Sequence, residues 1–349
     1  ALLTTKRSQI GSRIRTIPIL GHVDELDSVV RRIGKSGAPP KRLIVTNDAL
    51  RREPAIEEAI VTARRLGLQA ERLLRPTESG GPGHDQYQIA PIEIEDLIRR
   101  LVEGRRILVT GGGGSIGREL CRQVAAMGCA QLTIVEKSER PLVAIETDLQ
   151  DFRKGFEVEG LICDVRDRAA IMALIARFEP DVVFHAAALK HVPIVEAHIR
   201  QGVLTNVGGT RNVADGCLKA GVSAMVMIST DKAVRPTSVM GATKRAAESY
   251  CEALDALQIE EAAAQGEGDG GNRAPTRFLS VRFGNVLGSS GSVVPLFTQQ
   301  LRQGGPLTVT HPEMRRYFMT ISEAVSLVLM SSAQGLERRA PQTIYVLDM

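Results

Sequence analysis

Three consecutive residues of this chain bring a hydroxyl, a carboxyl group and an amine together. Thr230, Asp231 and Lys232 come at the end of residues 224–229, an apolar run typical of a buried strand. A carboxyl group and an amine at the carboxyl end of a parallel strand can act as acid and base on a ligand bound at that edge. We therefore predict proton-transfer chemistry here.

A helix predicted to follow this strand carries Met240 and Lys244. A spacing of four residues places both side chains on one helical face, so they point toward the same region. Lys244 adds a second amine to the group, whereas the thioether of Met240 cannot transfer protons.

A glycine-rich loop provides the second chemical signal. Residues 110–117 read Thr-Gly-Gly-Gly-Gly-Ser-Ile-Gly between a predicted strand and a predicted helix. Glycines let the backbone approach a pyrophosphate, and the N–H groups at the start of the helix stabilise its charge. No Lys-Ser/Thr pair follows, so the loop favours a dinucleotide over a nucleoside triphosphate. The predicted contacts are Gly111, Gly114, Ser115, Ile116 and Gly117.

Residues after the next strands indicate which dinucleotide binds. Glu136 ends the second predicted strand, where a carboxylate can accept hydrogen bonds from the adenosine ribose, which favours NAD. Lys137 and Arg140 are close enough to bind a 2′-phosphate, so NADP is the alternative. Asp164 could reach the adenine edge or cap the following helix. The other predicted cofactor contacts are Val165, Ala186, Ala187 and Ala188.

A parallel sheet would bring these groups to one edge. Six strand-like runs alternate with helix-like segments, at residues 106–110, 132–135, 158–163, 181–185, 224–229 and 276–283. This order predicts an α/β fold with a doubly wound parallel sheet. Residues 344–347 are also strand-like, and residues 260–275, which are polar and rich in glycine, are expected to form a surface loop.

A smaller α/β unit precedes this sheet. Residues 1–87 alternate short strands and helices without a glycine-rich phosphate loop. We expect an incomplete, Rossmann-like domain that serves packing or assembly, with a ligand site as the alternative. The Ser-Gly-Gly-Pro-Gly sequence at residues 79–83 places the boundary near residue 87. Residues 88–349 then form the NAD-binding domain, with substrate elements toward its C-terminal end.

Seven motifs carry a resemblance to a known family. They lie at residues 110–117, 185–191, 205–210, 229–234, 239–244, 282–288 and 316–320. Together they make the chain resemble the nucleotide-sugar 4,6-dehydratases of the extended short-chain dehydrogenase/reductase superfamily. Within that group it is similar to the UDP-N-acetylglucosamine 4,6-dehydratase type, in the large, membrane-anchored polysaccharide-biosynthesis branch.

The resemblance implies a UDP-N-acetylglucosamine-like substrate and a tightly held NAD(P) that is reduced and reoxidised within one turnover. It implies that Thr230 lies near the sugar C4, that Asp231 protonates the departing C6 hydroxyl, and that Lys232 removes the C5 proton. Lys244 matches the lysine that holds the nicotinamide ribose. Met240 stands where smaller soluble members have tyrosine, so Thr230 acting through a water becomes the best candidate to assist the first oxidation.

Several polar residues are candidate substrate contacts. Asn206 matches an asparagine that supports the catalytic helix, although it could serve packing alone, and Lys190 could line the sugar site or lie on the surface. Residues 288–292 suit a diphosphate, and arginine matches phosphate geometry. The candidates are Lys190, Asn206, Asn285, Ser289, Arg282, Arg315 and Arg316. The spacing of His185, His191 and His198 fits no compact metal motif, so we predict no metal.

The composition excludes several classes of protein. Apolar residues make up 43% of the 349 residues and charged residues 24%, which excludes a mainly disordered or collagen-like chain. The 44 Lys and Arg stand against 40 Asp and Glu, so we expect no nucleic-acid partner. No apolar run reaches the roughly 18 residues of a membrane helix. Five cysteines without a C-x-x-C pattern favour a reduced cytosolic compartment.

The sequence begins at Ala1 rather than at Met and stops within a strand-like run. With the resemblance, this leads us to expect a longer parent protein with membrane helices upstream. This part would then lie at the cytoplasmic face of the inner membrane, as a homo-oligomer. A nucleotide-sugar 4-epimerase or oxidoreductase is one alternative, but it predicts tyrosine at position 240. A non-catalytic NAD-binding regulator is the other.

Overall fold

The structure is a computed structural model that describes the chain in several stretches. These are residues 2–37, 39–46, 54–74, 88–150, 156–265, 274–289, 293–309, 311, 313, 318–337 and 343–347. The chain divides into two compact units, Ala1–Asp96 and Leu97–Met349. The predicted boundary near residue 87 falls outside the described residues.

The first unit contains two small sheets. Its elements are β1 (Leu2–Thr4), η1 (Arg7–Gln9), β2 (Arg13–Ile14), β3 (Ile17–His22), η2 (Val23–Glu25), α1 (Leu26–Ser36), β4 (Arg42–Val45), α2 (Pro54–Arg65), β5 (Gln69–Leu74) and β6 (Gln88–Pro91). The sheets have the orders β1-β3-β2 and β4-β5-β6. Short strands and helices follow one another through this unit, as expected. Helix α3 (Ile92–Val102) follows and crosses the division between the units.

The second unit is built around a seven-stranded sheet in the order β15-β12-β11-β10-β7-β8-β9. Its strands are β7 (Arg106–Thr110), β8 (Gln131–Glu136), β9 (Glu157–Ile162), β10 (Val182–His185), β11 (Ala224–Thr230), β12 (Arg277–Phe283) and β15 (Ile344–Val346). Every pair of neighbours in this sheet is parallel. The predicted doubly wound parallel sheet is therefore confirmed.

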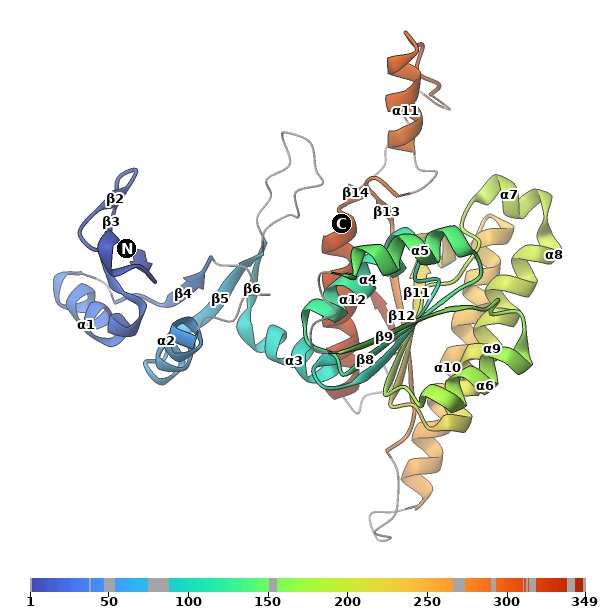
Figure 1. Ribbon diagram of the computed structural model, residues 1–349, viewed down its shortest axis with the longest axis horizontal. Coiled ribbons are helices and arrows are strands. Elements are labelled where there is room, and N and C mark those ends of the chain that lie inside the picture. The colour runs from blue at the N-terminus through green and yellow to red at the C-terminus, as the bar shows by residue number, and fades with distance from the viewer. Residues whose placement is uncertain are drawn as a thin grey trace. The chain divides into compact units, whose positions relative to one another are not determined.

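Helices cover both faces of this sheet (Figure 1). One face carries α4 (Ser115–Ala126), α5 (Glu139–Asp148) and α12 (Ile321–Glu337). The other carries α6 (Arg168–Phe178), α9 (Thr210–Ala220) and α10 (Val239–Gln265). The remaining elements are α7 (Val192–Ala197), α8 (Ile199–Gly202), the π-helix η4 (Val203–Gly209), η5 (Asp231–Ala233), β13 (Asn285–Val286), α11 (Val293–Arg302) and β14 (Phe318–Met319).

Local sequence explains why these elements start and stop where they do. Strand β7 is buried from its second residue to its last, as expected for a parallel strand with helices on both sides. Helix α6 begins after Asp167, whose side chain accepts a hydrogen bond from the Ala170 N–H at 3.0 Å. Helix α9 ends at Ala220, and Gly221 after it has a φ of +61°, the left-handed conformation that glycine adopts easily.

The core on the α6, α9 and α10 side holds the second unit together. Buried Leu108, Val183, Met225 and Phe278 of the strands belong to one apolar cluster with side chains of the three helices. This packing fixes the strand ends relative to the helices, and those strand ends carry the predicted site.

One sequence-based expectation is wrong in part. Residues 260–265 were expected in a surface loop, but α10 continues to Gln265. The reason is that residues 260–265 read Glu-Glu-Ala-Ala-Ala-Gln, all strong helix formers, and the glycines begin only at Gly266. Residues 266–273 lie outside the described part of the chain.

Within the described residues, no helix is both long enough and apolar enough to cross a bilayer.

Candidate active site

The carboxyl ends of four neighbouring strands bring the predicted site residues to one edge of the sheet. Thr110 at the end of β7 pairs with His185 at the end of β10, and His185 pairs with Met227 of β11. Strand β11 runs three residues further, to Thr230, which pairs with Phe283 of β12. Because the chain leaves β7 and β10 in opposite directions across the sheet, a crevice is expected at this edge.

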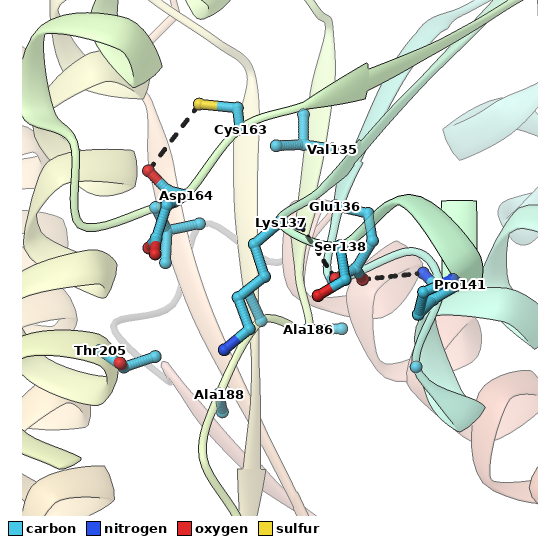
Figure 2. Close-up of a pocket in the computed structure, with 15 residues that line it drawn as sticks. Val135, Glu136, Lys137, Ser138, Pro141, Cys163, Asp164, Ala186, Ala188 and Thr205 are labelled. Atoms are coloured by element: carbon cyan, nitrogen blue, oxygen red, sulfur yellow. Dashed lines mark hydrogen bonds between the residues drawn. The ribbon is translucent and has the colours of Figure 1, made fainter. Parts of the chain in front are cut away.

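A cavity of about 320 Å³ lies at this edge, and Figure 2 shows the side chains around it. It is lined by Gly111, Gly113, Gly114, Val135, Glu136, Lys137, Ser138, Pro141, Cys163, Asp164, Val165, Ala186, Ala187, Ala188 and Thr205. The predicted cofactor contacts at positions 111, 114, 136, 164, 165 and 186–188 are therefore brought together. Ser115, Ile116 and Gly117 lie in the first turn of α4, beneath the loop rather than on the cavity wall.

The glycine loop reaches this position only because it has no side chains. Gly111 has a φ of +67°, and a Cβ built on it would lie 2.7 Å from the backbone N and Cα of Ala187. A Cβ on Gly117 would lie 2.1 Å from the carbonyl oxygen of Gly111. The loop therefore packs backbone against backbone, which leaves its N–H groups and the start of α4 facing a ligand.

Glu136 closes one side of the cavity. Its carboxylate accepts hydrogen bonds from the Gly113 N–H at 3.2 Å and from the Lys137 N–H at 2.9 Å. The residue is 9% exposed, and these two hydrogen bonds fix its carboxylate at the cavity wall. A carboxylate oxygen has a second lone pair, so Glu136 can still accept from a ligand hydroxyl.

Asp164 lies across the cavity, and its alternative role as a helix cap is wrong. Asp167 caps α6, whereas Asp164 accepts from Arg166, with a shortest contact of 2.5 Å between its Oδ2 and Nη2. The Arg166 guanidinium holds the pKa of the Asp164 carboxyl below its usual value, and the Lys137 amine acts in the same direction. Lys137 extends its side chain into the cavity (Figure 2).

Thr230, Asp231 and Lys232 form one hydrogen-bonded group. The Thr230 hydroxyl donates to Asp231 Oδ1 at 2.8 Å, and the Lys232 Nζ donates to the same oxygen at 3.0 Å. The Lys232 side chain is 34% exposed and that of Asp231 is 50% exposed. Solvent reaches both side chains, and the two form an ion pair.

Lys244 is held on the face of α10 that meets the sheet. Its Nζ donates to the carbonyl oxygen of Ile228 at 2.9 Å, and the residue is 5% exposed. Burial lowers the pKa of Lys244 to about 8, and Glu248 and Cys251 oppose that shift. Met240, one turn earlier, is 3% exposed.

Asn206 supports the site rather than facing a ligand. It is fully buried in the π-helix, accepts from the Leu189 N–H at 2.8 Å and donates to the Leu189 carbonyl at 2.9 Å. Its amide also lies 3.0 Å from the Thr243 hydroxyl of α10. Because these bonds occupy its amide, Asn206 ties the loop after β10 to the helix that carries Lys244.

His185 takes part in a second buried network. Its Nδ1 lies 2.7 Å from the Thr110 hydroxyl and its Nε2 lies 3.0 Å from the Thr210 hydroxyl, which donates to the Asn206 carbonyl at 2.6 Å. Burial lowers the pKa of His185 to about 3, with a further contribution from Lys244. The imidazole is therefore neutral at physiological pH.

The other substrate candidates have different surroundings. Arg282 pairs with the buried Glu248, with its Nη2 at 2.5 Å from Oε2, which commits it to a protein partner. Lys190 is exposed, whereas Asn285 at the start of β13 and Ser289 in the following turn are half-buried. Arg315 and Arg316 lie outside the described residues. No group of acidic, histidine or cysteine side chains in the described stretches could hold a metal ion.

Some cavity residues were missed by sequence reasoning. Most of them lie in or next to the glycine-rich loop or a predicted strand end, namely Gly113, Val135, Ser138, Pro141 and Cys163. The rule that ligands bind at the carboxyl ends of parallel strands could have found them. Thr205 lies on the π-helix, and only its position within the motif at residues 205–210 hints at a role.

The sequence of the second unit is similar to that of known proteins. The family model described as "Polysaccharide biosynthesis protein" matches residues 107–349. The probable polysaccharide biosynthesis protein EpsC of Bacillus subtilis is 42% identical over 275 residues, which are 75% of this chain and 43% of that protein. The chain thus spans less than half the length of this relative.

Two further relatives have more specific names. UDP-N-acetylglucosamine 4,6-dehydratase (inverting) of Campylobacter jejuni is 33% identical over 239 residues, 66% of this chain and 64% of that protein. UDP-glucose 4-epimerase of Rickettsia rickettsii is 33% identical over 235 residues, 66% of this chain and 63% of that protein. The X-ray structure of Pen from Bacillus thuringiensis is similar with a TM-score of 0.59 and 30% identity, over 71% of this chain and 70% of that chain.

Proposed function

Because this chain belongs to the polysaccharide biosynthesis protein family, we propose that it is a nucleotide-sugar 4,6-dehydratase that holds NAD and acts on UDP-N-acetylglucosamine. The observation that carries this proposal is the bonded group of Thr230, Asp231 and Lys232 at the sheet edge that also bears the glycine-lined cavity. The name of the Campylobacter jejuni relative supports the same reaction.

The cavity suits a dinucleotide. At Gly111 a Cβ would collide with Ala187, so the loop keeps a bare backbone in which N–H groups can bind a pyrophosphate. Glu136 would accept from ribose hydroxyls, and Lys244 would hold the nicotinamide ribose. When it is bound, NAD would accept a hydride from C4 and return it to C6, so that the net change in the sugar is the loss of one water.

Lys232 and Asp231 would divide the proton transfers that follow oxidation at C4. A ketone at C4 acidifies the C5 proton, which a neutral Lys232 amine can remove. Asp231 in its acid form then protonates the C6 oxygen, so that the C6 hydroxyl departs as water.

The ion pair already contains the proton that this division requires. The Lys232 Nζ and Asp231 Oδ1 are 3.0 Å apart, so one proton can pass from the amine to the carboxylate along their hydrogen bond. That transfer produces a neutral amine and a protonated acid at once. A sugar that covers the exposed pair would exclude water and favour the uncharged forms, because desolvation penalises charge.

One carboxylate oxygen of Asp231 is available to a substrate. Both Thr230 and Lys232 donate to Oδ1 of Asp231. Among the described residues, the other carboxylate oxygen, Oδ2, accepts no hydrogen bond, so it can face the C6 hydroxyl.

Mass spectrometry after incubation with UDP-N-acetylglucosamine tests the proposal. We expect a product lighter than the substrate by one water. A product of unchanged mass that chromatography separates from the substrate would instead indicate a 4-epimerase. NAD-loaded protein that leaves the substrate unchanged would indicate a regulator, and either result would overturn the proposal.

A further inference from the structure

A buried carboxylate lies beneath the strand end that carries the proton-transfer group. Glu248 of α10 is fully buried. Its Oε1 accepts from the Ser229 hydroxyl at 2.5 Å and from Arg282 Nε at 2.8 Å, and its Oε2 accepts from Arg282 Nη2 at 2.5 Å. Arg245 Nη1 lies 3.3 Å from the same Oε2. A charge buried to this degree is costly unless it is paired, so these bonds offset the cost of burying Glu248.

The partners of Glu248 lie next to the site. Ser229 immediately precedes Thr230 in β11, and in the sheet it is paired with Arg282 of β12. Glu248 therefore binds two adjacent strands at the point where they end. It also lies four residues after Lys244, on the same helical face.

From this arrangement we propose that Glu248 is a positioning residue. It fixes the strand end that carries Thr230, Asp231 and Lys232 against the helix that carries Lys244, and it provides the negative charge that balances Lys244. The inference deepens the proposed dehydratase function and rests on it.

The electrostatic part of this role can be followed through Lys244. Glu248 and Cys251, both on α10, raise the pKa of Lys244. Lys244 in turn lowers the pKa of His185 on β10. Burial raises the pKa of Cys251 to about 12 and lowers that of His185 to about 3, so both are neutral near pH 7. Glu248 is the member of this set that is charged, because its bonds to Arg282 and Ser229 outweigh burial and keep its pKa below the usual value.

A second buried ion pair between α10 and β12 provides a matched control. Asp255 lies seven residues beyond Glu248 on α10, and its Oδ1 accepts from Arg277 Nε at 2.9 Å. It also accepts from the Phe278 N–H at 2.7 Å. Asp255 is fully buried, but it binds the first two residues of β12, at the opposite end of that strand from the site. Its loss should therefore reduce stability without changing the site.

The test compares Glu248→Gln with Asp255→Asn. Each variant removes one buried charge and keeps the side-chain shape. We would measure thermal stability, the affinity for added NAD after removal of bound nucleotide, and turnover, the last two across pH 6 to 10.

In Glu248→Gln we expect turnover to fall by about 10- to 100-fold, because the strand end shifts relative to α10. Loss of the negative charge should also lower the pKa of Lys244, so NAD affinity and turnover should decline at a pH about one unit lower than in the wild type. Asp255→Asn should lose stability and keep the wild-type pH profiles. Equal profiles for the wild type and a folded Glu248→Gln would overturn the inference, as would the same shift in Asp255→Asn.

A double variant keeps the inference testable if the single variant does not fold. Glu248→Gln/Arg282→Gln leaves no unpaired buried arginine and should show the same shift of the NAD-affinity profile. Asp255→Asn/Arg277→Gln is its matched control. If the wild type binds NAD but releases no water from the substrate, the proposed function fails, whereas the NAD-affinity profiles still decide whether Glu248 balances Lys244.

Discussion

Gly241 in the first turn of α10 lies against the backbone of Lys232. A Cβ built on Gly241 would stand 2.2 Å from the Lys232 carbonyl oxygen and 3.2 Å from its carbonyl carbon. Real Cβ contacts are not this short, so the helix that carries Met240 and Lys244 can pack directly on the turn that carries Asp231 only because residue 241 has no side chain.

Gly241→Ala should separate the two halves of the proton-transfer site. The added methyl group must push α10 away from the turn at Lys232, and a displacement of about 1 Å can cost on the order of 100-fold in turnover. NAD should remain bound through the loop around Gly111, but more weakly, because Lys244 moves with α10. Gly208→Ala is the control: its Cβ would meet no atom closer than 3.9 Å, and activity should persist. Full activity in Gly241→Ala would show that the contact does not position the site.

Two glycines with left-handed backbone separate the effect of backbone strain from that of a side-chain collision. Gly111 and Gly128 have similar φ values, +67° and +78°, but a Cβ would collide with the Ala187 backbone at Gly111 and would meet nothing within 4 Å at Gly128. Both alanine variants should lose about 1–2 kcal/mol because of the left-handed backbone.

Only Gly111→Ala should also lose bound NAD, measured as the nucleotide released on denaturation. Equal nucleotide content in the two folded variants would contradict the view that backbone contact at Ala187 shapes the cavity.

The parts of the site that follow strand ends could be predicted from sequence. Parallel strands present their carboxyl ends at one edge, so Glu136, Asp164 and Asp231 could be placed together once the strand order was inferred. The same rule could not find Thr205, because it reaches the cavity from a π-helix, and such helices have no clear sequence signal.

Two other features depend on tertiary context. The exposure of Asp231 and Lys232 depends on what covers them, and their adjacency in the sequence does not reveal it. The partners of Glu248 come from two strands separated by the length of α10, and nothing at position 248 in the sequence reveals them.

Met240→Leu should retain most activity. Met240 is 3% exposed on α10, and leucine is close to methionine in volume, so the change should cost less than about 1.5 kcal/mol. Neither side chain can transfer a proton. Turnover and NAD content would be measured together; abolished turnover in a folded, NAD-loaded Met240→Leu would mean that the thioether has a role beyond packing.

His185 should make the folded state sensitive to acid. Its pKa is about 3 in the fold and about 6.5 in an unfolded chain, so below about pH 6.5 the unfolded state binds a proton that the folded state does not. The free energy of unfolding should therefore fall by about 1.4 kcal/mol per pH unit from this residue alone, until the pH approaches the folded value.

His185→Gln removes that titration, so its stability should decline less steeply than that of the wild type between about pH 6 and pH 4. Urea unfolding at several pH values measures both slopes. His198→Gln, at an exposed histidine, is the control and should keep the wild-type slope. Parallel curves for the wild type and His185→Gln would contradict a neutral buried imidazole.

The final prediction concerns how Lys232 and Asp231 divide the proton transfers. They share one hydrogen bond of 3.0 Å, but only a base can remove the C5 proton and only an acid can release the C6 hydroxyl as water. In deuterated water the wild type should therefore place deuterium at C5 of its product. Lys232→Ala should lose dehydration by about 10²- to 10⁴-fold, the usual contribution of a positioned base. It should still bind NAD, because Lys232 does not line the cavity. Asp231→Asn should block water loss yet permit slow exchange at C5, since the C4 ketone and Lys232 remain. Full dehydration by Lys232→Ala, or water loss by Asp231→Asn at the wild-type rate, would falsify this division.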